Sequence, residues 1–191
     1  MSNSLDNRLN HIYDRITADD FLKNSGASGE IGFHIFDYPP ADELRVRSFI
    51  STLLDQLTKR RPDLTYTHIN LFELVVQYLT DRKLLDRAYG FQKNKGDDEL
   101  LKALKGPLHE QKIAQYLVEA RTPNDNDLIF ISGIGSCWPL IRSHTLLNSL
   151  HPFIDKAPLI LFYPGKYDGQ GLRLFGKLNE SNYYRAFQLI S

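Results

Sequence analysis

The stretch DLIFISGIGSCWPLIRSH, residues 127–144, carries the strongest indication of how this chain folds. Its apolar run over 128–132 is uninterrupted, which is typical of a strand buried on both faces of a sheet. Gly133 and Gly135 follow at once and indicate a tight turn, and a helical pattern begins near Pro139. Many α/β proteins bind phosphate where a strand ends in such a turn facing a helix N-terminus. The stretch therefore predicts one strand–helix unit of an α/β sheet and raises the question of a ligand.

Strand-like segments elsewhere in the chain alternate with helical ones. Besides 128–132, strands are predicted over 31–36, 64–69 and 159–163, with a last strand over 183–190. Amphipathic patterns between them predict helices. Strands that alternate with helices favour parallel pairing, because a crossover helix returns the chain to the same edge of the sheet. We therefore expect an α/β fold with a mainly parallel sheet of about five strands and helices on both faces, either Rossmann-like or like a degenerate P-loop fold.

The chain has 191 residues, the usual size of one domain, and no linker, repeat or low-complexity stretch divides it. We therefore predict a single domain over 1–191. The segment 84–121 has helical patterns and no strand pattern. It is predicted to be a helical insertion or a small subdomain within that single domain.

The composition excludes several classes of protein. Hydrophobic residues make up 42% and aromatic residues 12%, so the chain is not expected to be disordered. Basic and acidic residues balance at 23 each, which argues against a general polyanion-binding surface and against direct DNA binding. The single cysteine, Cys137, excludes an internal disulfide and a cysteine-rich zinc site. The sequence shows neither a signal peptide nor an apolar stretch of membrane-spanning length, so we expect a soluble cytoplasmic protein.

The end of the first predicted strand is where a P-loop would stand in a nucleotide-binding sheet. A P-loop needs glycines whose N–H groups wrap a phosphate, a lysine, and a hydroxyl that binds magnesium. Here the sequence is FDYPPADELR, residues 36–45. Pro39 and Pro40 lack N–H donors, and Asp37 is one of three acidic residues that repel phosphate. A nucleotide cradle of the P-loop kind is therefore not expected, and no cofactor is predicted.

The glycine turn after the third predicted strand has two interpretations. Its two glycines lack the third glycine of the dinucleotide-binding fingerprint, so the pair is a weak signal. In the structural interpretation the glycines allow a tight turn, and Ser136 caps a helix that has Pro139 in its first turn. In the functional interpretation Ser132, Ser136 and Arg142 face a groove and bind an anion or the acidic side chain of a partner.

Patterns for catalysis and metal binding are weak throughout the chain. Ser136 lies in Gly-Ile-Gly-Ser-Cys rather than in the G-x-S-x-G pattern of a nucleophile elbow. Cys137 is interpreted as a packing residue, and no two of the six histidines have the short helical spacing of a metal site. A pairing of Asp37 with Asp168 across the strand ends stays an alternative for binding a divalent ion. The leading prediction contains no catalytic residue and no metal site.

The stretch KYDGQGLRLFGKLNESN, residues 166–182, is rich in glycine and polar residues and predicts a long loop. It is either an ordered loop closed by its own aromatic side chains or a recognition surface. Aromatic and arginine side chains are favoured at the energetic centres of interfaces. We predict that the strand-end groove and the loop from Lys166 to Lys177 contact a protein partner. The predicted partner- or ligand-binding residues are Asp37, Ser132, Ser136, Trp138, Arg142, Tyr167, Asp168 and Arg173.

Five distinctive segments follow one another over nearly the whole chain. They are FDYPPADELRVR, KGDDELLKALKGPL, LIFISGIGSCWPLIRSHTLLNSLHP, LILFYPGKYDGQGLRLFGKL and NYYRAF. Together they resemble the BrxB family, whose members are small proteins encoded in bacterial BREX phage-defence systems. The resemblance implies a role in blocking phage replication alongside other BREX proteins, which include the PglZ phosphatase-superfamily protein, a DNA methyltransferase and a large ATPase. It does not imply a set of catalytic residues.

Three functions stay open at this point. The first is a non-catalytic binding and assembly component of a BREX complex, with PglZ as the foremost partner. The second is a regulator that depends on a nucleotide or small ligand in the strand-end groove, and the missing P-loop argues against it. The third, direct DNA binding, is disfavoured by the zero net charge. The sequence predicts no membrane association and makes no prediction of the oligomeric state.

Overall fold

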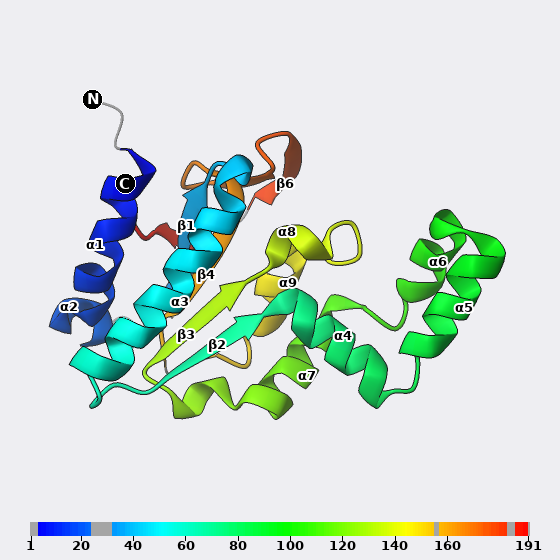
Figure 1. Cartoon of the computed structure of the whole chain (residues 1–191), viewed down its shortest axis with the longest axis horizontal. Helices are drawn as coiled ribbons and strands as arrows, with labels where there is room; N and C mark the ends of the chain where they lie inside the picture. Colours follow the sequence, from blue (N-terminus) through cyan, green and yellow to red (C-terminus); the bar gives the residue numbers. More distant parts are fainter. Residues whose placement is uncertain (1–3, 24–31, 155–156, 183–185, 191) are drawn as a thin grey trace.

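The computed structural model describes residues 4–23, 32–154, 157–182 and 186–190. Its centre is a sheet in which five parallel strands lie in the order β2-β3-β4-β1-β7 (Figure 1). Their bounds are β1 Phe33–Tyr38, β2 Tyr66–Asn70, β3 Leu128–Ser132, β4 Leu159–Tyr167 and β7 Ala186–Gln188. The prediction of a mainly parallel α/β sheet is confirmed. The strand order differs from the 3-2-1-4-5-6 order of the dinucleotide-binding fold, so the likeness to that fold lies in the layers and not in the topology.

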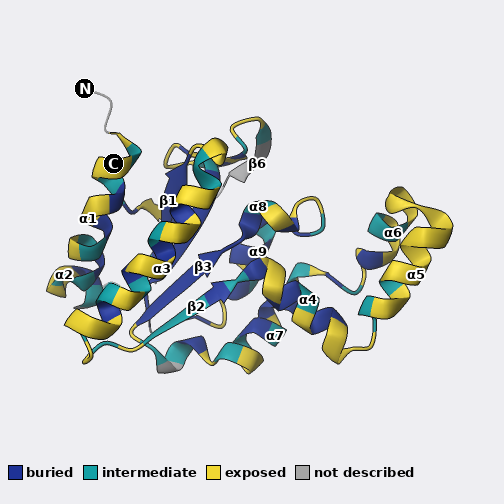
Figure 2. Ribbon diagram, in the orientation of Figure 1, coloured by how far each residue is buried: buried dark blue, intermediate teal, exposed yellow. Residues whose placement is uncertain are grey.

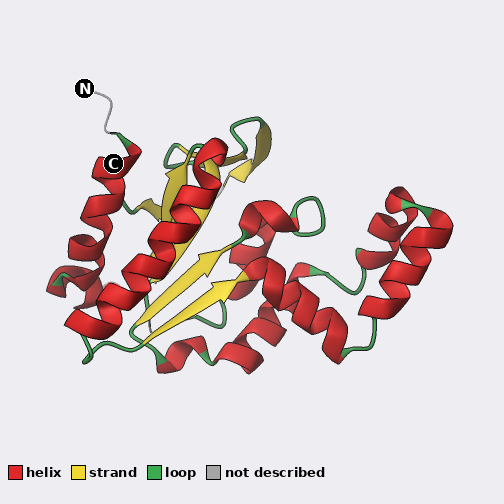
Figure 3. Ribbon diagram, in the orientation of Figure 1, coloured by secondary structure: helices red, strands yellow, loops and turns green. Residues whose placement is uncertain are grey.

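Helices cover both faces of the sheet (Figure 3). One face carries α1 Leu5–Thr17, α2 Asp19–Lys23 and α3 Glu43–Arg60. The other face carries α4 Leu71–Asp81, α7 Glu110–Arg121, α8 Ile134–Cys137 and α9 Ser143–Leu150. Each face therefore has its own hydrophobic cluster, and the dark interior of Figure 2 follows the strands and the inner sides of these helices. Within the described ranges, every helix is too short or too polar to traverse a bilayer.

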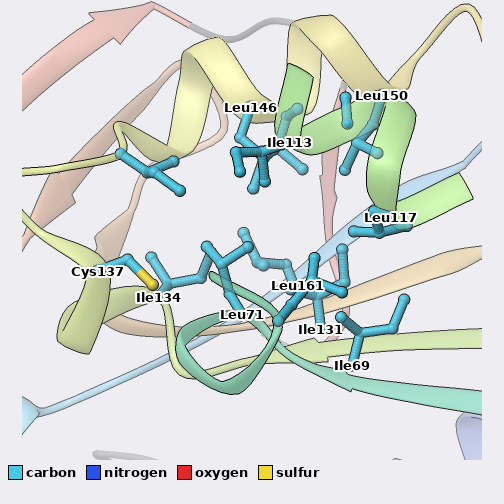
Figure 4. Packing of buried hydrophobic residues seen from close by; sticks show 14 of the residues in the cluster. Ile69, Leu71, Ile113, Leu117, Ile131, Ile134, Cys137, Leu146, Leu150 and Leu161 are labelled. Carbon is cyan, nitrogen blue, oxygen red and sulfur yellow. The ribbon is translucent and has the colours of Figure 1, made fainter. Parts of the chain in front are cut away.

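The packing of β3 on both faces explains why its apolar run predicts the fold well. Ile129 and Ile131 lie in the cluster formed with α4, α7 and α9, whereas Leu128 and Phe130 lie in the cluster formed with α1 and α3. Successive side chains of a strand point to opposite faces, so a strand covered on both faces has no polar position in its middle. Figure 4 shows the first of these clusters from close by, with Ile69, Ile131 and Leu161 of three strands and Ile113, Leu117, Leu146 and Leu150 of the covering helices.

The segment 84–121 contains three helices that differ in their relation to the sheet. Helix α7 packs its apolar side into the core. The other two, α5 Leu85–Lys95 and α6 Asp97–Leu104, form a pair that projects beyond α4 (Figure 1). In this pair Leu104 is buried, whereas α5 has no fully buried residue. Helix α7 thus belongs to the body of the domain, and α5 and α6 extend from it.

Two predictions about the last part of the sheet need correction. Strand β4 does not end at residue 163 but continues through Gly165 to Tyr167. The predicted loop over 166–182 contains an antiparallel hairpin of β5 Gly171–Leu174 and β6 Leu178–Asn182, which extends the sheet from β4. The two leucines of β5 alternate with an exposed arginine and enter the core. This two-residue period is only three side chains long, so the surrounding glycine and polar residues concealed it.

The outer limits of two predicted strands lie partly outside the described residues. Residue 31 of the strand predicted over 31–36 is outside them, and β1 runs on to Tyr38. Residues 183–185 of the strand predicted over 183–190 are also outside them, and the observed part is β7.

Candidate functional site

The carboxyl ends of β1, β2, β3 and β4 meet at one edge of the sheet, because these strands are parallel. We call this edge, with the segments that follow the strands, the carboxyl edge. A 3-10 turn, Pro40–Asp42, leads from β1 into α3, while α4 follows β2, α8 follows β3, and the β5–β6 hairpin follows β4. The residues predicted from sequence lie at or shortly after these strand ends. Asp37, Ser132 and Tyr167 are buried there, and Ser136, Trp138, Arg142, Asp168 and Arg173 are exposed.

Asp37, near the end of β1, links separate segments of the chain through hydrogen bonds. Its Oδ1 accepts a hydrogen bond of 2.6 Å from the guanidinium of Arg8 on α1. Its Oδ2 accepts a bond of 3.0 Å from the backbone N–H of Tyr167 on β4. Arg8 also donates to the backbone carbonyls of Asp37 and Ile190, at 2.8 and 3.1 Å. Asp37 and Arg8 together therefore join α1, β1, β4 and the C-terminal segment, and both carboxylate oxygens of Asp37 are bonded within the chain.

Tyr167 is a core residue, so the prediction that its side chain lies on a binding surface is wrong. Only 2% of the residue is exposed, and its hydroxyl donates a hydrogen bond of 2.6 Å to the carbonyl of Ala186 in β7. Burial raises the pKa of this hydroxyl, which keeps it protonated as a donor. The reason is the extra length of β4: Lys166 points outward, so its neighbour Tyr167 points inward.

The alternative of a cation site between Asp37 and Asp168 does not fit the geometry. Both oxygens of Asp37 are already bonded, as described above. Asp168 Oδ1 accepts hydrogen bonds from the N–H groups of Gln170 and Gly171, at 3.1 and 2.8 Å, and Oδ2 lies 3.8 Å from Arg173. Those backbone N–H groups lower the pKa of Asp168. Among the described residues, no group of three or more His, Cys, Asp or Glu is arranged to hold a metal ion.

Ser132 lies against a histidine that sequence reasoning had left among the structural ones. His68 Nε2 is 2.9 Å from Ser132 Oγ, across the adjacent ends of β2 and β3. Burial lowers the pKa of His68, so its imidazole is neutral at pH 7. A neutral ring and a hydroxyl satisfy each other at this site, and only 6% of Ser132 is exposed. The pair is a closed hydrogen-bonded contact and not the lining of an anion site.

The two glycines of the turn after β3 are required by close packing. Gly133 has a φ of +76°, and a Cβ at this position would overlap Asn70 Oδ1. A Cβ on Gly135 would lie 3.0 Å from Phe175 and 3.0 Å from Pro164. The first glycine thus makes room for the β2–α4 junction and the second for the β4–β5 hairpin. Packing within the chain is therefore sufficient to explain both glycines.

The expected helix cap at Ser136 is wrong. Ser136 lies inside the single-turn helix α8, and the next helix, α9, begins only at Ser143. Trp138 precedes Pro139 and has an extended backbone, with φ −73° and ψ 138°. Proline disfavours the helical region for the residue before it, so α8 ends there. Arg142 stands at the N-cap position of α9 without a capping hydrogen bond from its side chain.

A chain of hydrogen bonds links the β1 side of the carboxyl edge to the β3 side. The hydroxyl of Tyr38 donates to Glu43 at 2.6 Å, and Arg47 Nε donates to the same carboxylate at 2.7 Å. Arg47 also donates to Ser136 Oγ on α8 at 3.3 Å. Burial and the neighbouring Glu43 raise the pKa of Tyr38. Sequence reasoning missed Arg47, although its spacing of four residues from Glu43 on one helix was a usable signal.

Large apolar side chains remain exposed along the carboxyl edge. Trp138 is 44% exposed and makes an edge-to-face contact with Phe175, with 6.5 Å between the ring centroids. Leu44 in the first turn of α3 is 75% exposed, and Phe72 in the first turn of α4 is 45% exposed. Sequence reasoning missed these two because each occurs in an otherwise ordinary amphipathic helix. Exposed carboxyl-edge residues include Leu44, Arg47, Phe72, Ser136, Trp138, Arg142, Asp168 and Arg173.

Comparison with known proteins identifies the family. The model of the family described as "BREX protein BrxB" matches residues 67–189. A "BREX protein BrxB" of Bacillus cereus (strain H3081.97) is 40% identical over 190 residues, which is 97% of each chain. A "BREX protein BrxB" of Escherichia coli O9:H4 (strain HS) is 39% identical over 186 residues, covering 97% of this chain and 92% of that protein. No solved structure gives a significant match. The chain therefore belongs to the BrxB family of BREX proteins.

Proposed function

We propose that this chain is a non-catalytic binding and assembly component of a BREX phage-defence complex. The proposed partners are other BREX proteins, with PglZ foremost, and the proposed location is the cytoplasm. Membership of the BrxB family supports the connection to BREX. The carboxyl edge supports a binding role, since it combines engaged polar groups with exposed aromatic and arginine side chains.

One observation carries the proposal. Side chains at the carboxyl edge whose chemistry could serve catalysis are hydrogen-bonded to other parts of the chain, as Asp37 is to Arg8 and Ser132 to His68. In contrast, Arg173 on β5 of the hairpin and Trp138, which contacts Phe175 at the hairpin turn, remain exposed. Tryptophan and arginine are enriched among residues that dominate binding energy at protein interfaces. This distribution suits recognition of a protein surface better than chemistry on a small substrate.

The test is the affinity of the purified chain for purified PglZ, measured by calorimetry. Trp138→Ala and Arg173→Glu should each weaken association by about ten-fold or more, which corresponds to about 1.4 kcal/mol. Both should leave the Tm nearly unchanged, because substitutions at exposed positions usually cost under about 0.5 kcal/mol. Lys59→Glu, a charge reversal at the far end of α3, is the matched control and should bind normally. Unchanged affinity in both carboxyl-edge variants would place the interface elsewhere.

The rival function is a regulator that responds to a nucleotide or small ligand at the carboxyl edge. The exposed Arg47 and Ser136, which bridge α3 and α8, are the feature that favours it. Thermal denaturation with ATP, GTP, NAD or S-adenosylmethionine separates the two functions. A ligand at 100 times its Kd adds about 2.7 kcal/mol of stability. Such a shift, lost in Arg47→Ala, would favour the regulator over the assembly component.

A further inference from the structure

Helix α5 is less buried than any other α-helix of the described chain. None of its residues is fully buried, and Leu85 and Ala88 pack only partly against the core. Figure 2 shows the helix as mostly exposed, at the end of the molecule farthest from α1. A helix of this kind gains little from its own chain, because most helical stability in proteins comes from a buried apolar face.

Gly90 lies in the middle of α5, and no contact with another described residue requires a glycine there. Its φ is not in the left-handed region, and a Cβ added to it would meet no atom within 4 Å. Glycine is among the least favourable residues for a helix interior. The glycine therefore lowers the stability of α5 and serves no contact among the described residues. A position without a side chain on an exposed helix does allow the backbone of another molecule to approach closely.

The surroundings of Gly90 have the composition of a binding surface. At 100° per residue, Tyr89 and Phe91 lie on opposite flanks of the glycine, and they are 61% and 38% exposed. Lys93 lies four residues after Tyr89, and Arg87 lies four residues before Phe91, so each aromatic side chain has a cation beside it. In the part of the chain that the structure describes, no ion pair forms at Arg87 or Lys93. Asp86, four residues before Gly90, lies on the same side of the helix, so two cations and one carboxylate give this side a net positive charge. We call these residues with Gly90 the α5 face.

We propose that the α5 face docks an acidic amphipathic helix of another BREX protein, which crosses α5 at Gly90. The glycine admits close contact between the helices, Tyr89 and Phe91 flank the crossing helix, and the cations pair with its carboxylates. This surface is separate from the carboxyl edge, and the proposal rests on the proposed assembly role only for the source of the partner.

Charge favours this occupant over two others. A second copy of the chain would bring the same net positive charge against Arg87 and Lys93, and like charges repel across such a contact. A nucleic acid would meet Asp97, Asp98 and Glu99 at the start of α6, directly after the basic end of α5. Phosphate contacts dominate nucleic-acid affinity, so this acidic run opposes that partner. A protein helix can place its acidic side chains along α5 and avoid the acidic run.

The test compares stability with binding in Gly90→Ala and Gly90→Gln of the full chain. Each purified BREX protein is titrated against wild type and variants, with a 30-base-pair DNA duplex as a further probe. Both substitutions should raise the Tm of the free chain by about 2–4 °C, because both residues favour a helix more than glycine does. Both should weaken binding of one BREX protein, by about three-fold for alanine and by about ten-fold or more for glutamine. Lys93→Glu should weaken it as well, and more strongly at low salt.

Opposite effects on stability and binding distinguish docking from a structural role. Ser51→Ala on α3 is the control, because it also favours the helix and should leave binding unchanged. A raised Tm with normal binding of every BREX protein by Gly90→Gln overturns the proposal. Duplex binding that Lys93→Glu abolishes, or self-association that Gly90→Gln abolishes, also overturns it in favour of another occupant. If Arg173→Glu weakens a complex and Gly90→Gln does not, the α5 face fails while the assembly role stands; if no BREX protein binds wild type, both fail.

Discussion

The turn after β3 and helix α5 each contain a glycine, and the two glycines have opposite surroundings. Gly133 has a positive φ and stands where a Cβ would overlap Asn70, whereas a Cβ on Gly90 would meet no atom within 4 Å. The first glycine is explained by contacts of the chain itself. No contact among the described residues requires the second. The surroundings of a glycine thus separate one that the fold requires from one that it does not.

Charged residues show the same contrast. At the carboxyl edge, Asp37 and Arg8 are 12% and 14% exposed at their side chains and form an ion pair. On α5, Arg87 and Lys93 are exposed, and neither forms an ion pair within the described residues. Substitutions of the buried residues at the carboxyl edge should therefore change the free energy of unfolding, whereas substitutions of exposed side chains on α5 should leave it nearly unchanged. Four predictions test this separation.

The largest loss of stability is expected for Asp37→Ala. The change removes the partner of a nearly buried guanidinium, and breaking such a pair costs roughly 3–5 kcal/mol. Because the pair retains some exposure, we expect about 3 kcal/mol in urea denaturation. The double variant with Arg8→Ala should cost clearly less than the sum of the two single changes, since no charge is then left unpaired. Additive costs would show that the pair is not coupled.

Gly133→Ala should be the next most destabilising change, at about 2 kcal/mol. The alanine would need a positive φ and would also displace Asn70, which caps α4. Gly106→Ala is the control, because its Cβ would meet nothing within 4 Å and its φ is not positive. That control should change the unfolding free energy by under about 0.5 kcal/mol. Equal effects of the two substitutions would contradict the role given to the turn.

Tyr167→Phe should cost about 1 kcal/mol, because it leaves the carbonyl of Ala186 without its donor. Tyr89→Phe on α5 makes the same chemical change at an exposed side chain and should leave the Tm unchanged. Thermal denaturation of both variants measures the two effects. This pair of variants compares the two regions most directly. If Tyr167→Phe left the Tm unchanged, the hydrogen bond between Tyr167 and Ala186 would contribute no net stability.

The smallest effect on stability is expected for Arg87→Ala, which should change the unfolding free energy by less than about 0.5 kcal/mol. Its side chain is exposed, and alanine is at least as favourable in a helix. A cost above about 1 kcal/mol in urea denaturation would show that the chain itself uses this arginine. The division between the two regions would then not hold for α5.

The architecture was predictable because its signals are local. The uninterrupted run over 128–132 requires cover on both faces, and the alternation of strands with helices favours parallel pairing, whatever lies elsewhere in the chain. Pro39 and Pro40 likewise argue against a P-loop from their own chemistry. The β5–β6 hairpin was missed because its apolar period is short. The start of α9 was missed because a proline can either open a helix or end the preceding one.

The sequence by itself determined the class of fold, the position of the carboxyl edge and most residues that lie there. Only the tertiary structure decided which of them face inward. Asp37 and Tyr167 have the residue types of a binding site, yet the length of β4 and the approach of α1 bury both. The sequence does not single out Gly90, because only the structure shows that no other atom lies near it. Residue type and period are properties of neighbours along the chain, whereas burial depends on contacts between segments far apart in sequence, such as Arg8 with Asp37.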